Sequence, residues 1–282
     1  MTNKRRNVEQ VIVPEITSDG AGVKLKRSIA TRSLSYVDPF LLFDHFGSDN
    51  PDEYIAGFPL HPHRGIETVT YMLAGAVKHK DSSGNEGVIR TGDVQWMTAG
   101  GGIMHEEMPI LQDGRMEGFQ LWVNLPAKLK MSKPRYQEVA SASIPEYKGA
   151  DGVSIRVIAG KVGDMDGAVS EIAADPTYLD VRVPAGVIFK HAIPQGHTAL
   201  AYLFEGSGRF DSETEVTAPR LIIFEDGDEI EVIAGESGAR FLLISGKPLG
   251  EPVARYGPFV MNTEAEIEQA LSDLRRGTFI QK

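Results

Sequence analysis

The sequence predicts an all-β protein built from two similar domains, and three observations support this prediction. Glycine and proline recur about every ten residues, with short apolar runs between them. These runs are rich in β-branched and aromatic residues, which favour strands. The segment 71–75 (YMLAG) is echoed at 202–206 (YLFEG), and a Gly-Asp turn follows each copy. A chain of 282 residues can hold two such domains.

Individual strands can be placed from the apolar runs. The clearest lie at 69–73, 94–97, 120–123, 154–158, 178–183, 199–204 and 240–244. We expect an N-terminal domain over residues 1–140 and a C-terminal domain over residues 141–282. The boundary follows from the stretch 133–145, which contains two prolines together with serines and is typical of a linker.

One short helix is predicted near the C-terminus. Thr263 and Glu266 have the spacing of a capping box, and Gly277 marks the end of the helix. Its apolar stripe is expected to consist of Ile267, Ala270, Leu271 and Leu274.

Composition excludes several classes of function. The formal net charge of −10 disfavours a nucleic-acid partner, and no apolar run approaches the roughly 20 residues of a membrane span. Residues 1–10 are polar and basic, unlike a secretory signal. Because the chain has no cysteine, disulfides, zinc fingers and thiolate nucleophiles are excluded, and any metal must be held by nitrogen and oxygen ligands. We expect a cytoplasmic protein.

Two pairs of possible metal ligands lie in the N-terminal half. His61 and His63 are two residues apart, and so are His105 and Glu107. On a strand, residues two apart point to the same face. Two such strands would present three imidazoles and one carboxylate to one ion, a ligand set that suits iron, manganese, nickel or copper.

Three carboxylates are candidates for the fourth ligand. Glu106 should face away from His105 if the strand is regular. Glu67 shares the parity of His61 and His63, but the Arg-Gly step at 64–65 allows a break in register. Geometry favours Glu107 over Glu67 and leaves Glu67 as the alternative.

The residues around these ligands resemble a known family. Gly57, His61, His63, Glu67 and Gly75 resemble the first cupin motif, and Gly92 with His105 the second. In detail, residues 20–279 are similar to the pirin family, as the segments 38–40 (DPF), 44–46 (DHF), 61–70 (HPHRGIETVT), 95–109 (QWMTAGGGIMHEEMP), 125–127 (LPA), 134–137 (PRYQ) and 257–263 (GPFVMNT) indicate. The resemblance implies two cupin (jelly-roll) β-barrels with a short C-terminal helix, and it implies Glu107 as the fourth ligand.

The resemblance also implies a function. Some pirin-like proteins are dioxygenases that open flavonols such as quercetin, which implies Fe(II) as the cofactor, with Mn, Ni, Cu or Zn as alternatives. Glu107 would be the catalytic base that accepts the hydroxyl proton, and the partner would be a small aromatic substrate. The alternative is a non-enzymatic, iron-dependent regulator that binds another protein. We expect a monomer with no membrane or nucleic-acid partner.

The remaining histidines are expected to play other roles. Alignment of 202–206 with 71–75 places Ala192 and Pro194 opposite His61 and His63, so no metal is expected in the second domain, where His191 and His197 lie off the pattern. His45 is either a pocket residue or a structural one. His79, between two lysines, is predicted to be exposed. The apolar side chains that could form a pocket wall or core are Phe46, Phe58, Trp96 and Met104.

Overall fold

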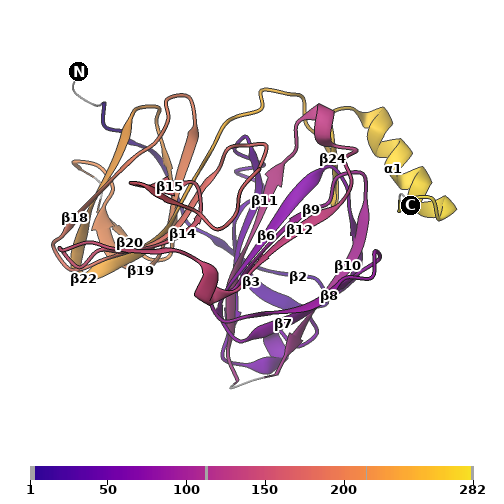
Figure 1. Ribbon diagram of the computed structural model, residues 1–282, viewed down its shortest axis with the longest axis horizontal. Coiled ribbons are helices and arrows are strands. Elements are labelled where there is room, and N and C mark those ends of the chain that lie inside the picture. The colour runs from indigo at the N-terminus through magenta and orange to yellow at the C-terminus, as the bar shows by residue number, and fades with distance from the viewer. Residues whose placement is uncertain (1–3, 112–113, 214, 281–282) are drawn as a thin grey trace. The chain divides into compact units, whose positions relative to one another are not determined.

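The computed structural model describes residues 4–111, 114–213 and 215–280, and its strands divide between two compact units (Figure 1). The first unit comprises residues 15–141 and 249–280. The second comprises residues 4–14 and 142–248. Each expected strand segment lies within an observed strand, so the all-β prediction is confirmed. No described helix has the length and apolar character needed to cross a membrane.

Two antiparallel sheets form the first unit. One has the order β12 (Arg135–Val139), β9 (Val94–Thr98), β6 (Ile66–Ala74), β11 (Met116–Asn124), β4 (Phe40–Ser48), β3 (Val23–Ile29) and β2 (Glu15–Asp19). The other has the order β5 (Phe58–His63), β10 (Ile103–Ile110), β7 (Ala76–Asp81) and β8 (Glu86–Arg90). The hairpin of β23 (Ala254–Tyr256) and β24 (Phe259–Met261) and the short 3₁₀ helices η1 (Pro51–Glu53) and η2 (Ala127–Leu129) complete it.

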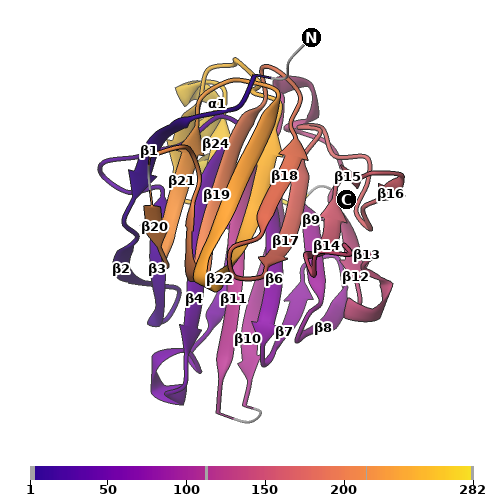
Figure 2. The same cartoon turned by 90° about the vertical axis from the view of Figure 1, so that its left-hand side faces the viewer.

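One large antiparallel sheet forms the second unit. Its order is β1 (Val8–Ile12), β21 (Arg220–Phe224), β19 (Thr198–Arg209), β22 (Glu229–Gly246), β17 (Thr177–Val183), β14 (Ser154–Ala159) and β13 (Glu146–Lys148). β18 (Ile188–Ala192) and β20 (Glu215–Thr217) pair with β22 and β19, and Figure 2 shows the strands side by side. The 3₁₀ helix η3 (Ser141–Ser143) precedes β13, and β15 (Lys161–Val162) pairs with β16 (Met165–Asp166).

The unit boundaries differ from the expected division at both ends of the chain. The internal change of unit falls between Ser141 and Ala142, beside the expected position. However, residues 4–14 belong to the second unit and residues 249–280 to the first. The physical reason is strand pairing and packing: β1 hydrogen-bonds to the edge strand β21, and the C-terminal segment buries Phe259, Met261 and Phe279 in an apolar cluster of the first unit.

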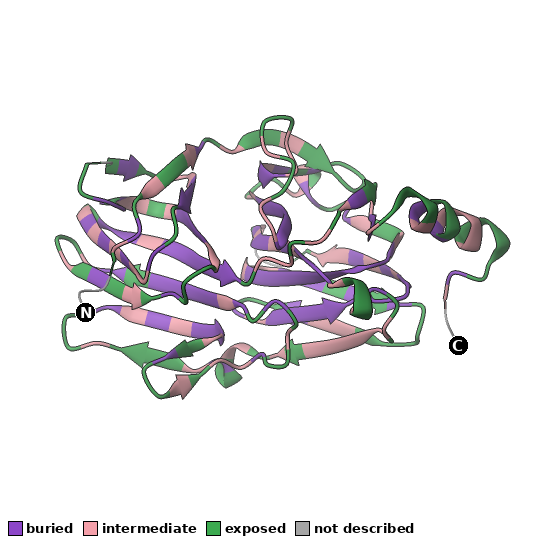
Figure 3. Ribbon diagram, turned by 90° about the horizontal axis from the view of Figure 1, so that it is seen from above, coloured by how far each residue is buried: buried purple, intermediate pink, exposed green. Residues whose placement is uncertain are grey.

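The predicted helix is α1 (Glu264–Arg276). Thr263 and Glu266 form the reciprocal capping box, and Gly277 ends the helix with a φ of 70°. Ile267 and Ala270 are buried, whereas Leu274 is 36% exposed, so the apolar stripe is shorter than expected. Figure 3 shows this one-sided burial along the helix.

The interiors of the two units differ in character. In the second unit, one apolar cluster extends from Val153 to Leu243 and includes Phe210 and Phe241. Its described buried polar or charged side chains are Arg6, Asp180, Asp211 and Ser245. The first unit buries many more, among them the following: Asp44, His45, His63, Arg64, Glu67, Thr70, His79, Asp81, Gln95, Thr98, His105, Glu107 and Lys130.

Candidate metal centre

Two neighbouring strands carry the three histidines of the predicted site. His61 and His63 lie on β5 and point to the same face because they are two residues apart. On β10, His105 is directly opposite His61, and Ile103 is opposite His63. Directly opposed residues of antiparallel strands bring their side chains close together. The register of two adjacent strands therefore gathers the three imidazoles.

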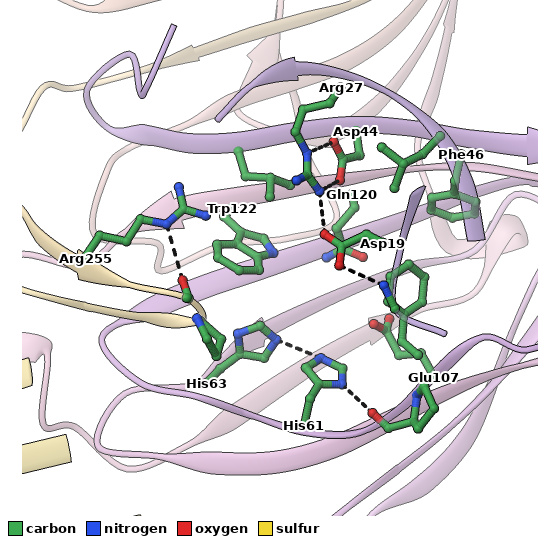
Figure 4. Close-up of a pocket in the computed structure, with 17 residues that line it drawn as sticks. Asp19, Arg27, Asp44, Phe46, His61, His63, Glu107, Gln120, Trp122 and Arg255 are labelled. Atoms are coloured by element: carbon green, nitrogen blue, oxygen red, sulfur yellow. Dashed lines mark hydrogen bonds and ion pairs between the residues drawn. The ribbon is translucent and has the colours of Figure 1, made fainter. Parts of the chain in front are cut away.

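The three rings converge on one point. Their centroids are 4.4 Å apart for His61 and His105, 4.8 Å for His61 and His63, and 5.0 Å for His63 and His105. One nitrogen from each ring lies within 4.8 Å of the other two. The Nδ1 atom of His61 lies 2.9 Å from the carbonyl oxygen of Pro59, which assigns the proton to Nδ1 and the lone pair to Nε2. That Nε2 lies 3.0 Å from Nε2 of His63 (Figure 4).

The polar groups of this cluster need a partner that the protein does not supply. His105 is 1% exposed, and neither of its ring nitrogens has a hydrogen-bond partner among the described residues. Burial, followed by the neighbouring histidines, holds the pKa of both His63 and His105 well below the usual value. The rings are therefore neutral at physiological pH and keep lone pairs free. These features fit a divalent transition-metal ion, which neutral imidazoles bind readily.

Glu107 faces the same pocket as the histidines but stands outside their tight group. It is 8% exposed, and its Oε1 accepts a hydrogen bond of 3.1 Å from Thr70 Oγ1. The pairing of β10 with β5 shifts register between His105 and Glu107, whereas the pairing with β7 stays regular through both residues. The expected parity is therefore kept on the β7 side. Glu107 remains the candidate fourth ligand as a proposal.

The two rival carboxylates have other surroundings. Glu67 is 3% exposed and accepts hydrogen bonds from Trp96 Nε1 at 3.1 Å and from Thr98 Oγ1 at 2.7 Å. Its carboxylate is thus already satisfied by two donors, and it does not line the pocket. Glu106 is less buried than His105 and Glu107, as the alternation of β10 requires. Neither residue matches Glu107 as a neighbour of the histidines.

His61 and His63 open onto a pocket of about 510 Å³ within the first unit, and His105 lies behind them. This volume lies in the range of small-molecule sites, roughly 300–1,000 Å³. Side chains from both sheets and from β23 line it, chiefly Phe46, Phe58, His61, His63, Glu107, Gln120, Trp122, Arg27, Asp44, Asp19 and Arg255 (Figure 4). The pocket combines an apolar wall, a metal-binding face and a charged rim, and a flat aromatic molecule suits this combination.

One arginine in the charged rim is fully neutralised. Arg27 donates to both carboxylate oxygens of Asp44, at 2.8 and 2.7 Å, and to Asp19 at 2.7 Å. Bidentate pairing of this kind fixes a guanidinium in place. The three side chains therefore form a rigid part of the pocket rim.

The segment that follows the histidine pair is held firmly in place. Arg64 is 2% exposed and donates to the carbonyl oxygen of Gly101 at 2.7 Å and to Asp273 on α1 at 2.8 Å. Gly65 has a φ of 80°, and a Cβ there would lie 1.9 Å from the carbonyl oxygen of Val260, so no larger residue fits. The C-terminal segment thus fixes the end of the strand that carries His61 and His63.

The prediction that His79 is exposed is wrong. Its exposure is 0%, and its Nε2 lies 3.1 Å from Glu138 Oε1. On β7, Lys78 and Lys80 point outward, and strict alternation sends the residue between them inward. The flanking lysines indicate only the outer face of the strand and not a solvated segment.

The other residues considered from sequence fall into two groups. Phe46 and Phe58 line the pocket, whereas Trp96 lies in the core and Met104 packs near α1. His45 is 5% exposed and bonds to Glu117 at 3.0 Å outside the pocket lining, which favours the structural role.

The two remaining histidines lie in the second unit. His191 stacks on Phe189 at 6.2 Å, and His197 lies 4.0 Å from Asp175. Neither belongs to the group of close ligands found among the described residues.

Several pocket residues were not identified from the sequence. Gln120 and Trp122 alternate on β11, so strand parity alone would have placed them on one face. Arg255 comes from the far end of the chain, and no local pattern links it to residues 61–107.

Comparison with known proteins agrees with this geometry. The pirin family model matches residues 22–123, and the model of the pirin C-terminal cupin domain matches residues 178–280. A Caulobacter vibrioides pirin-like protein is 46% identical over 275 residues, covering 97% of this chain and 99% of that protein. A Pseudomonas aeruginosa protein whose name refers to quercetin 2,3-dioxygenase is 47% identical over 278 residues, covering 96% of this chain and 97% of that protein.

A solved structure has the same fold as this chain. The crystal structure of quercetin 2,3-dioxygenase from Acinetobacter baumannii matches with a TM-score of 0.90 and 36% identity, covering 98% of this chain and 99% of that chain. The expected two cupin barrels are thereby confirmed. The histidine cluster, the two family matches and these relatives lead to one conclusion: the chain belongs to the pirin family.

Proposed function

We propose that the first unit binds one Fe(II) ion through His61, His63 and His105, with Glu107 as the fourth ligand. The observation that carries this proposal is the convergence of three imidazoles at the wall of a pocket, one of them buried with no hydrogen-bond partner among the described residues. Nitrogen and oxygen donors also suit Mn, Ni, Cu and Zn. Iron is preferred because the proposed reaction uses dioxygen.

We further propose that the protein is a dioxygenase of the quercetin 2,3-dioxygenase type. Two relatives bear that activity in their printed names, which supports flavonols as the substrate class. The bound ion would supply Lewis acidity and one-electron chemistry toward the flavonol and dioxygen. The protein would orient the flat substrate between Phe58 and Trp122, both of which line the pocket.

Glu107 has the position expected of the base. Thr70 Oγ1 donates to its Oε1, which leaves Oε2 to accept the proton of a flavonol hydroxyl. The proton would then lie on a buried carboxyl beside the substrate. Transfer at this atom is the step that the protein itself would perform.

Activity with quercetin tests the proposal directly. Iron-loaded protein should consume quercetin with matching oxygen uptake and carbon monoxide release, and His105→Ala should lower the rate to background. His191→Ala, a substitution at a histidine of the second unit, is the matched control and should keep full activity. Equal rates for wild type and His105→Ala would refute the enzyme assignment. That result would favour the alternative, a metal-dependent regulator that binds another protein.

A further inference from the structure

Arg255 differs from the other arginine of the pocket because, among the described residues, its hydrogen bonds go to carbonyl oxygens and not to a carboxylate. Its Nη1 donates to the carbonyl oxygen of Leu41 at 3.0 Å, and its Nε donates to that of Gly257 at 3.3 Å. Among the described residues, Arg255 forms no ion pair, and its Nη2 has no hydrogen-bond acceptor. Arg27, by contrast, is held by two aspartates. One cation of the pocket thus keeps an unused donor.

This cation lies beside the metal-binding face. The guanidinium carbon of Arg255 is 5.1 Å from the centroid of the Trp122 ring. Trp122 also contacts His63, and the two rings meet edge to face at a centroid distance of 5.0 Å. Figure 4 shows Arg255, Trp122 and His63 together on one side of the pocket, with Glu107 beyond His61. A single indole ring therefore spans from the free cation to the histidine cluster.

The electrostatics of this position favour an anion. Burial, and then repulsion from Arg27, lowers the pKa of Arg255. A partly desolvated guanidinium with a free N–H is a strong partner for a carboxylate, because charge-assisted bonds are about twice as strong as neutral ones. Asp44 and Asp19 act on Arg255 only through space and partly oppose this lowering of its pKa, because the bonds of both carboxylates go to Arg27.

We propose that Arg255 binds a carboxylate on the aromatic substrate, so that the ring lies along Trp122 and its hydroxyl end reaches the histidine cluster. This assignment rests on the proposed function and adds hydroxylated aromatic acids to the flavonols as a substrate class of the same pocket. Glu107 lies beyond His61 from Arg255 (Figure 4), so an acid that binds in the reverse orientation would place its carboxylate near that of Glu107. Arg255 would therefore set both specificity and orientation.

A matched pair of ligands tests the proposal. The probes are 6-hydroxy-2-naphthoate and its neutral analogue 6-hydroxy-2-naphthamide, titrated calorimetrically into metal-loaded protein. We expect wild type to bind the acid more tightly than the amide. Arg255→Gln should weaken binding of the acid by roughly 10-fold to 100-fold, which is the usual contribution of a hydrogen bond to a charged group. Binding of the amide should change less than about twofold, and Arg255→Lys should restore part of the acid preference.

Two results would overturn the proposal. One is equal affinity for acid and amide in wild type, including no binding of either. The other is an equal loss of affinity for both ligands in Arg255→Gln, which would make Arg255 a structural residue that acts through its bonds to Leu41 and Gly257. Metal content and the thermal midpoint of the variant are measured alongside. Because the readout is binding, loss of acid preference is distinguishable from failure of quercetin turnover.

Discussion

The two units share a strand pattern but fill their interiors differently. In the first unit, β5 and β10 direct three histidines and a glutamate inward. In the second, the matching segment β18 offers Ala192 in place of a ligand, and the space is filled by an apolar cluster around Phe210 and Phe241. Burying polar groups is unfavourable unless they are satisfied. The comparison therefore predicts that a bound ion would stabilise the first unit, whereas apolar packing stabilises the second.

The strongest test of this contrast removes one ligand. Purified protein should hold about one transition-metal ion per chain, as a single close ligand group in the described residues implies. His61→Ala should weaken metal binding by more than the roughly 100-fold that loss of an outer-shell partner costs. Elemental analysis measures the content, with His191→Ala as the control in the second unit. Two ions per chain, or unchanged content in His61→Ala, would contradict the contrast.

A core substitution in the second unit tests whether apolar packing stabilises it. Phe210 is fully buried, and its ring lies 5.5 Å from Phe241 and 6.4 Å from Phe224. Phe210→Ala should lower the free energy of unfolding of the second unit by about 3–5 kcal/mol, the usual loss for such a cavity. Urea unfolding measures this loss, and the metal content of the folded protein should not change. Loss of metal together with stability would show that the two interiors are not independent.

The smallest expected effect separates two adjacent glutamates. Glu107→Gln should weaken metal binding by roughly 10-fold to 100-fold, the scale seen for disturbed metal sites. Glu106→Gln should leave it nearly unchanged, because Glu106 lies on the other face of β10. Competition with a coloured chelator gives both affinities. Equal weakening would mean that the register shift beside Glu107 reverses the facing of these side chains.

Sequence predictions succeeded where the structural cause is local and failed where it depends on residues that are distant in the chain. Parity within a strand is local, and it correctly brought His61 and His63 to one face and Glu107 to the pocket. The same rule, applied strictly, would have placed His79 inside. Register between β5 and β10, which sets His105 opposite His61, depends on tertiary packing, so the two-residue spacing could only suggest that the two pairs share one ion. Arg255 could not be predicted, because a contact between residues so distant in sequence leaves no local pattern.

The exchange of terminal segments affects how the protein is made. Arg64, which follows the histidine pair, needs Asp273 and the carbonyl oxygen of Phe279 as partners. A ribosome synthesises these residues after every described strand of both units, so the unit with the candidate metal centre stays incomplete until then. The second unit, whose edge strand β1 is made first, has all its strands by residue 246. The second unit is therefore expected to complete its fold before the first, although most of the first unit is synthesised earlier.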